Sequence, residues 1–301
     1  MTATGALVAS GFFSSPAVGT ALVIGAAVAL VSGPLGVFTV IRGQSFAGEA
    51  LGDIGMSGGS GAYLAGVGPL WGFLVAGVAA AALMELLGVQ RRRGRDLATG
   101  VVLGSGLGLA ALFLYLNSTE HGADVTMTVL FGSLFTVDRS TLPLVLVLAL
   151  LVLLALGAIA RPLLLASTSP ELAAARGVPV ALVGAAYLVA LSLSVALCAI
   201  TIGSILSTAL LVGPAAASLR LARRPGRAMA VAAALGVAAT WLGVLLAYDS
   251  YAWPPHHRGW PVSFFVVSLV FAEYLLCGLA GGRRPVRAPV LDTAPPAPLG
   301  G

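Results

Sequence analysis

The chain has 301 residues, of which 58% are hydrophobic and only 9% are charged, and its mean hydropathy is +1.02. A soluble domain carries about 25% charged residues, so most of this protein's surface must face lipid rather than water. All 16 basic residues are arginine. The missing lysine excludes a phosphate-binding Walker lysine, a Schiff base and a Ser-x-x-Lys nucleophile, so any ATP hydrolysis must come from a partner.

The net charge of +5 and the pI near 9.8 raise the question of nucleic acid. The arginines, however, form short clusters between apolar runs, which is typical of cytoplasmic membrane loops, and we expect no nucleic-acid partner. The two cysteines, Cys198 and Cys277, lie far apart within apolar runs. They are interpreted as buried small hydrophobes rather than as a disulfide or a metal cluster.

Apolar runs long enough to cross a bilayer, about 20 residues each, recur along the whole chain. The second run contains Glu49, Asp53 and many glycines, so a broken helix there, and eight spans in place of nine, stays open. The predicted spans are 17–41, 44–67, 69–89, 97–116, 141–160, 180–199, 203–221, 227–248 and 262–281.

The arginines orient these spans. With the N-terminus outside, only Arg139 and Arg258 lie outside, in agreement with the positive-inside rule. Omitting the second span would separate Arg42 from the cluster at 91–95, so we expect it to cross. The sequence thus predicts an all-α, polytopic integral membrane protein of eight to nine transmembrane helices. Residues 1–281 form the transmembrane domain, and residues 282–301 form a disordered, proline-rich cytoplasmic tail.

The second span carries the most informative polar residues. As a helix it places Glu49, Asp53, Met56 and Ser60 in one row, with the two carboxylates about 5–6 Å apart at Cβ. Ionisable groups in a span cost about 2.5–3.5 kcal/mol each and usually face an aqueous path or a partner. A divalent cation passing these oxygens is one interpretation. The alternative is that both acids lie at the cytoplasmic headgroup level.

Glu273 lies in the middle of the last span and is a second candidate for the ion pathway. The alternative is a protonated side chain that makes an interhelical hydrogen bond.

Two external loops carry the remaining candidates. His256 and His257 invite a metal-scavenging role, but adjacent side chains in an extended loop point apart, so solvated interfacial histidines are the alternative. Glu120, His121 and Asp124 are expected to present a polar face to an external partner.

Two further segments predict local structure. After the fifth span, Ser169 as N-cap, Pro170 in the first turn and Gly177 as a stop predict a short cytoplasmic helix. In the span at 203–221, Pro214 predicts a kink, and serines and alanines give a surface suited to close packing.

Together these segments resemble the permease subunit of the ATP-binding-cassette importers of zinc, manganese and iron, the ABC-3 family, over residues 20–281. The resemblance rests on the order and spacing of five landmarks: 42–53 with Gly61, Asp96-Leu97-Ala98-Thr99-Gly100, Leu130-Phe131-Gly132-Ser133-Leu134, Glu171-Leu172-Ala173 with Gly177, and Leu210-Leu211-Val212-Gly213-Pro214-Ala215-Ala216.

The resemblance implies a homodimer in the bacterial cell membrane, two cytoplasmic ATPase subunits and an external metal-binding lipoprotein. It also implies that the short helix, with Pro170, Glu171, Ala173 and Gly177, is the coupling helix that docks on the ATPase. The family's usual second span has an aspartate and then a serine-histidine pair, where this chain has Glu49 and then Gly52-Asp53.

The leading hypothesis is a metal-ion permease that is not itself an enzyme and holds no permanent cofactor. The divalent metal, zinc or manganese, is its substrate. Glu49, Asp53, Met56 and Glu273 are the expected pathway residues, and Ser207, Gly213 and Pro214 the expected gate or packing residues. The rival is a proton-coupled secondary transporter that uses Glu273 and Asp53 without an ATPase. A third hypothesis is a polytopic membrane enzyme, for which scattered external His and Asp residues are the only catalytic candidates.

Overall fold

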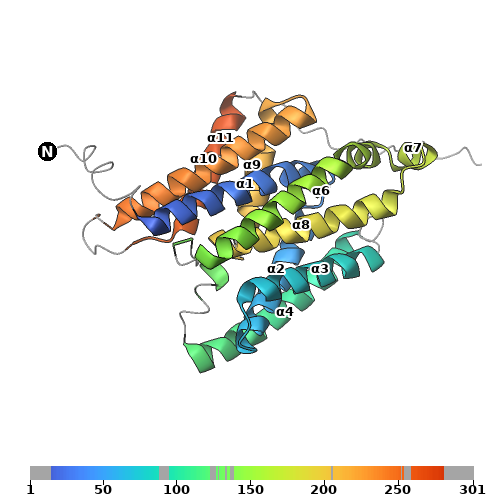
Figure 1. Ribbon diagram of the computed structural model, residues 1–301. Helices are drawn as coiled ribbons and strands as arrows, with labels where there is room; N and C mark the ends of the chain where they lie inside the picture. Colours follow the sequence, from blue (N-terminus) through green and yellow to red (C-terminus); the bar gives the residue numbers. More distant parts are fainter. Residues whose placement is uncertain are drawn as a thin grey trace, which may run out of the picture.

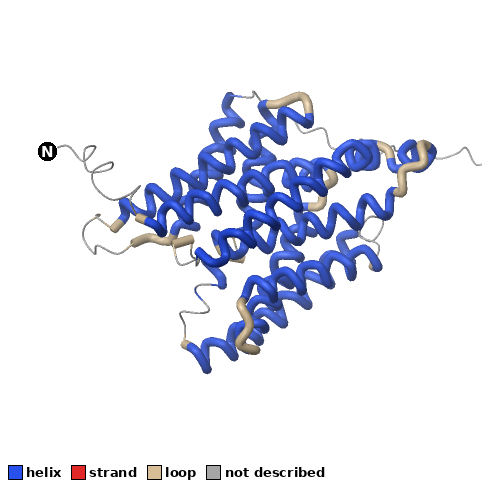
Figure 2. The backbone as a smooth tube through the Cα atoms, viewed as in Figure 1, coloured by secondary structure: helices blue, strands red, loops and turns tan. Residues whose placement is uncertain are grey.

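The computed structural model describes residues 15–87, 95–122, 127, 129–132, 134–135, 139–204, 206–251, 253 and 259–280. In these residues the fold is helical throughout, with no strand (Figure 2). The helices are α1 (Pro16–Ile41), α2 (Ser45–Leu64), α3 (Pro69–Leu86), α4 (Arg95–His121), the 3-10 turn η2 (Arg139–Thr141), α6 (Leu142–Thr168), α7 (Pro170–Ala175), α8 (Val180–Ile202), α9 (Ser207–Leu221), α10 (Pro225–Ser250) and α11 (Val262–Ala280).

Each predicted span corresponds to one helix in the described part of the chain. Seven helices are long and apolar enough to cross a membrane on their own. The exceptions are α2, which has 20 residues but is too polar, and α9, which has only 15. At about 1.5 Å per residue α9 spans about 22 Å, which is less than the hydrocarbon core. Both therefore depend on neighbouring helices to cover their backbone and polar groups.

The helices pack in two groups that meet at α8 (Figure 1). In one group α1 packs against α10, α9, α6 and α8, and α11 packs against α9 and α10. In the other, α2 is flanked by α3 and α4. α2 also touches α8 and α9, so it lies at the boundary between the two groups.

Two contacts identify opposite ends of the bundle. The Arg42 guanidinium, after α1, donates from Nη1 to Ser167 Oγ of α6 at 3.1 Å. At the other end, Arg139 donates from Nη2 to the carbonyl of Pro16, where α1 begins. α1 and α6 therefore run parallel, as an alternating topology requires of the first and fifth spans. Which end is cytoplasmic stays a prediction.

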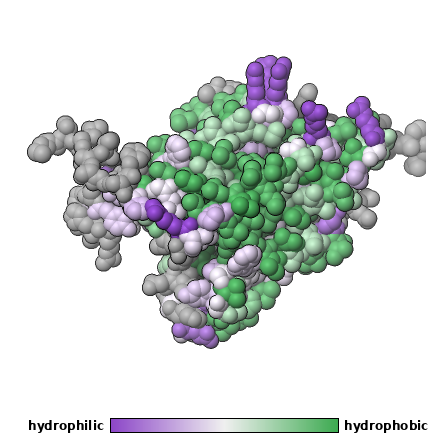
Figure 3. All heavy atoms as spheres, viewed as in Figure 1, coloured by the Kyte–Doolittle hydropathy of each residue, from purple (hydrophilic) through white to green (hydrophobic). Residues whose placement is uncertain are grey.

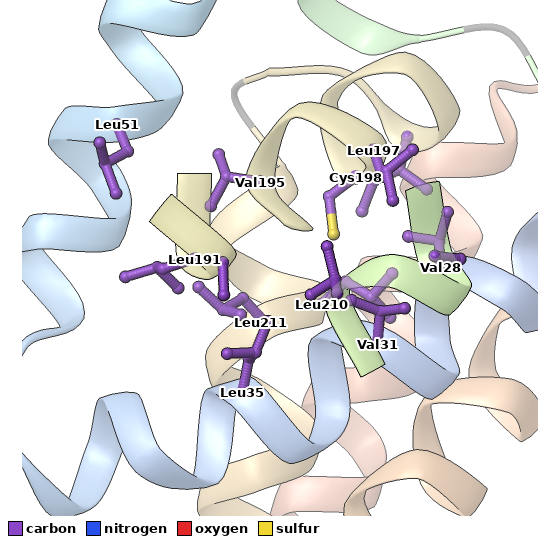
Figure 4. Packing of buried hydrophobic residues seen from close by; sticks show 14 of the residues in the cluster. Val28, Val31, Leu35, Leu51, Leu191, Val195, Leu197, Cys198, Leu210 and Leu211 are labelled. Carbon is purple, nitrogen blue, oxygen red and sulfur yellow. The ribbon is translucent and has the colours of Figure 1, made fainter. Parts of the chain in front are cut away.

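The core is built from aliphatic side chains of α1, α2, α8 and α9 (Figure 4). Leu51 of α2 faces Val195 and Leu191 of α8, and Leu35 of α1 lies beside Leu211 of α9. Cys198 lies in the same core and Cys277 is also buried, and both thiols are free. The interpretation of both cysteines as buried hydrophobes is confirmed.

The face of the molecule seen in Figure 3 is apolar over a broad middle band, with hydrophilic side chains gathered toward its edges. On α6 the exposed aliphatic residues recur along one side. They are Leu146, Val147, Leu150, Leu151 and Leu154. Such a surface is stable only in lipid or against another membrane helix, so the expectation of a multi-pass membrane protein is confirmed.

Several helices differ from their expected bounds. α4 continues to His121, beyond the expected residue 116. α6 runs on to Thr168 through Arg161 and Pro162, because the Arg161 side chain, two turns before the end of the helix, is exposed and costs little there. The span predicted from residue 203 instead begins at Ser207. Gly203, with φ 91°, ends α8, and the chain turns before α9 starts. The α8–α9 pair is therefore a hairpin whose tip is held inside the protein.

Candidate functional site

The polar row of the second span lies on α2. Glu49 and Asp53 are one helical turn apart and half-buried, whereas Met56 and Ser60 are fully buried. Neither carboxylate has a hydrogen-bond or ion-pair partner among the residues that the structure describes. Each would cost about 2.5–3.5 kcal/mol to insert on insertion scales. The pair is therefore the feature of α2 that packing alone does not explain.

Small residues let neighbouring helices approach the polar row closely. A side chain on Gly52 would meet Ser207 of α9 at 3.4 Å and Val195 of α8 at 3.5 Å. On the α4 side, Gly106 lies against the α2 backbone at Asp53 and Ile54. The stretch of α2 that carries the two carboxylates is thus in contact with α4, α8 and α9. α2 ends at Leu64, and Gly66 (φ 72°) lies in the following turn.

Met56 is held by the α8–α9 turn. The Ser204 hydroxyl lies 3.0 Å from the Met56 sulfur and 3.1 Å from the Val129 carbonyl, and its single proton serves one acceptor at a time. The Val129 carbonyl also accepts from the Ser204 backbone N–H at 3.2 Å. Residues 129–131 therefore cover the tip of the hairpin and fix it next to the polar row.

The end of the row away from Arg42 contains buried polar atoms without partners in the described part of the chain. Asn117 of α4 donates from Nδ2 to the carbonyls of Ser60 and Phe113, both at 2.9 Å. The Asn117 Oδ1 and Ser60 Oγ atoms are buried and have no partner within the described residues. Buried polar groups of this kind are usually paired with protein or water.

The predicted gate residues all lie on α9. Ser207, at its first turn, donates from Oγ to the Ser204 carbonyl at 2.7 Å, so it closes the hairpin. Pro214 is buried inside the helix, and Gly213 lies directly against Val270 of α11. These residues pack the hairpin against α11. A gating role for them stays a prediction.

Glu273 is not adjacent to the α2 row. It lies on α11, half-buried, with one carboxylate oxygen that has no partner in the described part of the chain. α9 lies between, since its Leu211 contacts Gly48 of α2 and its Gly213 contacts Val270 of α11. A proton relay from Glu273 to Asp53 would therefore have to pass α9.

The predicted short helix is confirmed as α7. Ser169 Oγ accepts from the Leu172 N–H at 3.3 Å, Pro170 starts the helix, and Gly177 follows it with φ 77°. Ala173 is completely buried against the bundle, whereas Leu172 and Glu171 are exposed. α7 therefore presents a small, rigidly seated surface at the bundle end marked by Ser167.

The external candidates are only partly described. Glu120 and His121 lie in the last turn of α4 rather than in a loop, and Glu120 is exposed. Asp124, His256 and His257 lie outside the described residues. Within those residues no group of three or more His, Cys, Asp or Glu could hold a metal ion. The α2 carboxylates are thus a two-residue feature.

Sequence reasoning missed the contacts that join distant segments. The Ser204–Met56 bond, the seat of the hairpin tip on residues 129–132 and the Asn117 contacts all link elements far apart in the chain. Gly203 within an apolar run was the local signal for a break. No local signal identifies the partners of Ser204.

The comparisons with known proteins agree with this architecture. A family model described as "ABC 3 transport family" matches residues 14–257. The chain is 28% identical to the manganese import system permease protein ScaB of Streptococcus parasanguinis over 229 residues, covering 76% of this chain and 81% of that protein. It is 29% identical to the manganese transport system membrane protein MntC of Halalkalibacterium halodurans, covering 72% of this chain and 74% of that protein.

A solved structure of PsaBC from Streptococcus pneumoniae in complex with Fab has the same fold. It matches with a TM-score of 0.77 at 22% identity, over 91% of this chain and 95% of that chain.

Proposed function

Because the chain belongs to the ABC 3 transport family, we propose that it is the membrane subunit of an ATP-driven importer of divalent metal ions. Manganese is the favoured substrate, since the relatives ScaB and MntC are named as manganese permeases. Zinc is the second choice. The chain itself is a transport subunit and not an enzyme.

The observation that carries this proposal is the Glu49–Asp53 pair. Two half-buried carboxylates without protein partners in the described structure lie inside the bundle, where α2 meets α4, α8 and α9. Hard carboxylate oxygens suit manganese. With Asp53 where the family usually has a histidine, the pair offers oxygen ligands only. A passing ion would offset the cost of placing both charges in the membrane.

Polar atoms further along α2 are consistent with an ion pathway that continues beyond the two carboxylates. Ser60 and Asn117 place unpartnered oxygens beyond Met56, on the side away from Arg42. The ion would enter from that side, delivered by an external metal-binding lipoprotein that docks near Glu120. The pathway ends at the α7 side of the bundle. Glu273 is not needed for this path.

Energy would come from a separate ABC ATPase, because the chain has no lysine for a Walker motif. α7 is the proposed docking element, with Glu171 and Leu172 exposed and Ala173 anchoring it. Closure of an ATPase dimer would move α7 and rock α8 and the hairpin, so that the α2 row opens to alternate sides. Two copies of this chain would serve the two ATPase subunits.

The test is manganese uptake by liposomes that hold the purified complex with its ATPase. Glu49→Gln and Asp53→Asn keep side-chain size and remove charge. Each is expected to lower uptake by more than about tenfold, since loss of even an outer-shell partner costs about 10- to 100-fold. Glu85→Gln, on α3 outside the row, is the matched control.

Normal uptake by both variants would contradict the pathway. Uptake by the subunit alone under a pH gradient would favour the proton-coupled alternative.

A further inference from the structure

Arg42 occupies the junction of four helices at the α7 end of the bundle. It follows the last residue of α1, and Gly43 (φ 63°) and Gln44 complete a three-residue connection to α2. The Gln44 carbonyl accepts from the N–H groups of Ala47 and Gly48, at 3.0 and 3.2 Å. The start of α2 is therefore tied closely to the end of α1.

The guanidinium reaches α2 and α6 at the same time. Its Nε donates to Gln44 Oε1 at 2.9 Å, and its Nη1 donates to Ser167 Oγ at 3.1 Å. Ser167 lies two residues before Ser169, the cap of α7. The rigid fork of one arginine thus bridges the segment that leads into α7 and the residue that opens α2.

The same guanidinium lies over α8. The distance from Arg42 Cζ to the Tyr187 ring centroid is 5.2 Å, within the range of a cation–π contact. Tyr187 is fully buried, and its hydroxyl pairs with Thr39 Oγ1 of α1 at 2.8 Å. Since Thr39 Oγ1 itself donates to the Leu35 carbonyl, Tyr187 is the donor in this pair. α8 leads from this contact to the hairpin tip at Gly203.

We propose that Arg42 is the positioning residue that transmits movement of α7 to α2 and α8. This inference rests on the proposed function, because it assumes that α7 docks on the ATPase. A shift of α7 displaces Ser167. Arg42 passes the shift to Gln44 and so to the helix that carries Glu49 and Asp53 one to two turns further on. Through Tyr187 the same displacement reaches the hairpin.

A purely topological role for Arg42 makes a different prediction. An arginine that only sets the topology needs its positive charge but not the fixed donor geometry of its guanidinium group. A positioning role needs two donors in fixed directions, which lysine does not supply. Loss of the link would leave ATP hydrolysis running without transport.

The experiment measures manganese ions taken up per ATP hydrolysed by the complex in liposomes. In Arg42→Gln we expect assembly with the ATPase and hydrolysis to persist, and the ratio to fall by about two- to thirty-fold, the range seen for residues that couple sites. Arg42→Lys should also lower the ratio. Arg161→Gln, an exposed arginine of α6, is the matched control and should keep it.

Ser167→Ala is the second variant, because it removes the acceptor for Arg42 on the α7 side and leaves the charge; the bond that Ser167 Oγ donates to the Leu163 carbonyl within α6 is lost with it. We expect a smaller fall in the same ratio. A wild-type ratio in Ser167→Ala, or in Arg42→Lys, would overturn the inference, whether or not Arg42→Gln folds.

The wild-type complex separates the two proposals. If it shows no ATP-dependent uptake, the proposed function fails, and this inference fails with it. If it transports and the variants keep its ratio, only the role of Arg42 is wrong.

Discussion

The backbones of Gly132 and Gly203 lie directly against each other at the tip of the α8–α9 hairpin. A side chain on either glycine would overlap the backbone of the other segment. Both also have positive φ, 67° and 91°. With ψ 157°, Gly203 lies in a region that is essentially restricted to glycine. The hairpin is thus seated on residues 129–132 by sterics as well as by hydrogen bonds.

Gly203→Ala is therefore expected to destabilise the protein strongly. The backbone strain alone costs about 1–3 kcal/mol, and the overlap adds to it. The measurement is the midpoint of thermal unfolding in detergent. Gly157→Ala, in the middle of α6 with open space around it, is the control and should be neutral or slightly stabilising. An equal midpoint for the two variants would contradict this account.

The Ser204–Met56 contact predicts that substitutions at the two residues have non-additive effects on stability. Ser204→Ala should cost about 1 kcal/mol, since the Val129 carbonyl keeps the Ser204 N–H as a donor. Met56→Leu preserves volume and should cost less than about 1.5 kcal/mol. Because each change removes the same bond, the double variant should cost less than the sum. Strict additivity in a double-mutant cycle would show that the hydroxyl does not use the sulfur.

The helices and the α7 cap could be predicted from the sequence because their signals are local. Apolar runs of bilayer length define seven of the helices, and Ser169, Pro170 and Gly177 define α7. The break between α8 and α9 was predicted, but several residues too early, because the residues around Gly203 stay apolar. The break is stabilised by Val129, a segment about 75 residues away, which no window along the chain contains.

The candidate site, too, could be predicted only in part from the sequence. Helical spacing alone places Glu49, Asp53, Met56 and Ser60 in one row, and α2 has that row. What surrounds the row follows from tertiary packing, and so does the separation of Glu273 from it by α9. A carboxylate in a span can be found from sequence, but its neighbours cannot.

Gly213 and Val270 offer a test of close packing between α9 and α11. A methyl group on Gly213 would overlap the Val270 side chain, so Gly213→Ala should cost about 1–3 kcal/mol. The added Val270→Ala change makes room and should recover part of that loss. If packing here also gates transport, uptake will follow the same order. A double variant less stable than either single one would contradict this explanation.

The cap of α7 predicts a local defect without global unfolding. Ser169→Ala removes the acceptor for the Leu172 N–H, which costs about 0.5–2 kcal/mol of helix stability. Since α7 is short and partly exposed, the unfolding midpoint should change little while retention of the ATPase in a pull-down falls. Ser169→Asp keeps a capping oxygen and should restore binding. Weak binding by both variants would point to the hydroxyl itself rather than to the cap.

The orientation of the bundle can be tested with single cysteines. The native Cys198 and Cys277 are buried, so a membrane-impermeant maleimide should label the wild-type protein very little. Glu120, in the last turn of α4, and Leu172, on α7, are both exposed and lie on opposite sides in the proposed topology.

Glu120→Cys should react in intact cells, whereas Leu172→Cys should react only after the membrane is opened. The reverse pattern would place α7 outside, where no ATPase can reach it, and would contradict both the topology and the coupling role. Labelling of both cysteines in intact cells would mean that the positions share one side. The contacts of Arg42 with Ser167 and of Arg139 with Pro16 argue against that arrangement. They show that α6 runs parallel to α1 through the bundle, so the start of α6 and its end, which leads into α7, lie at opposite ends.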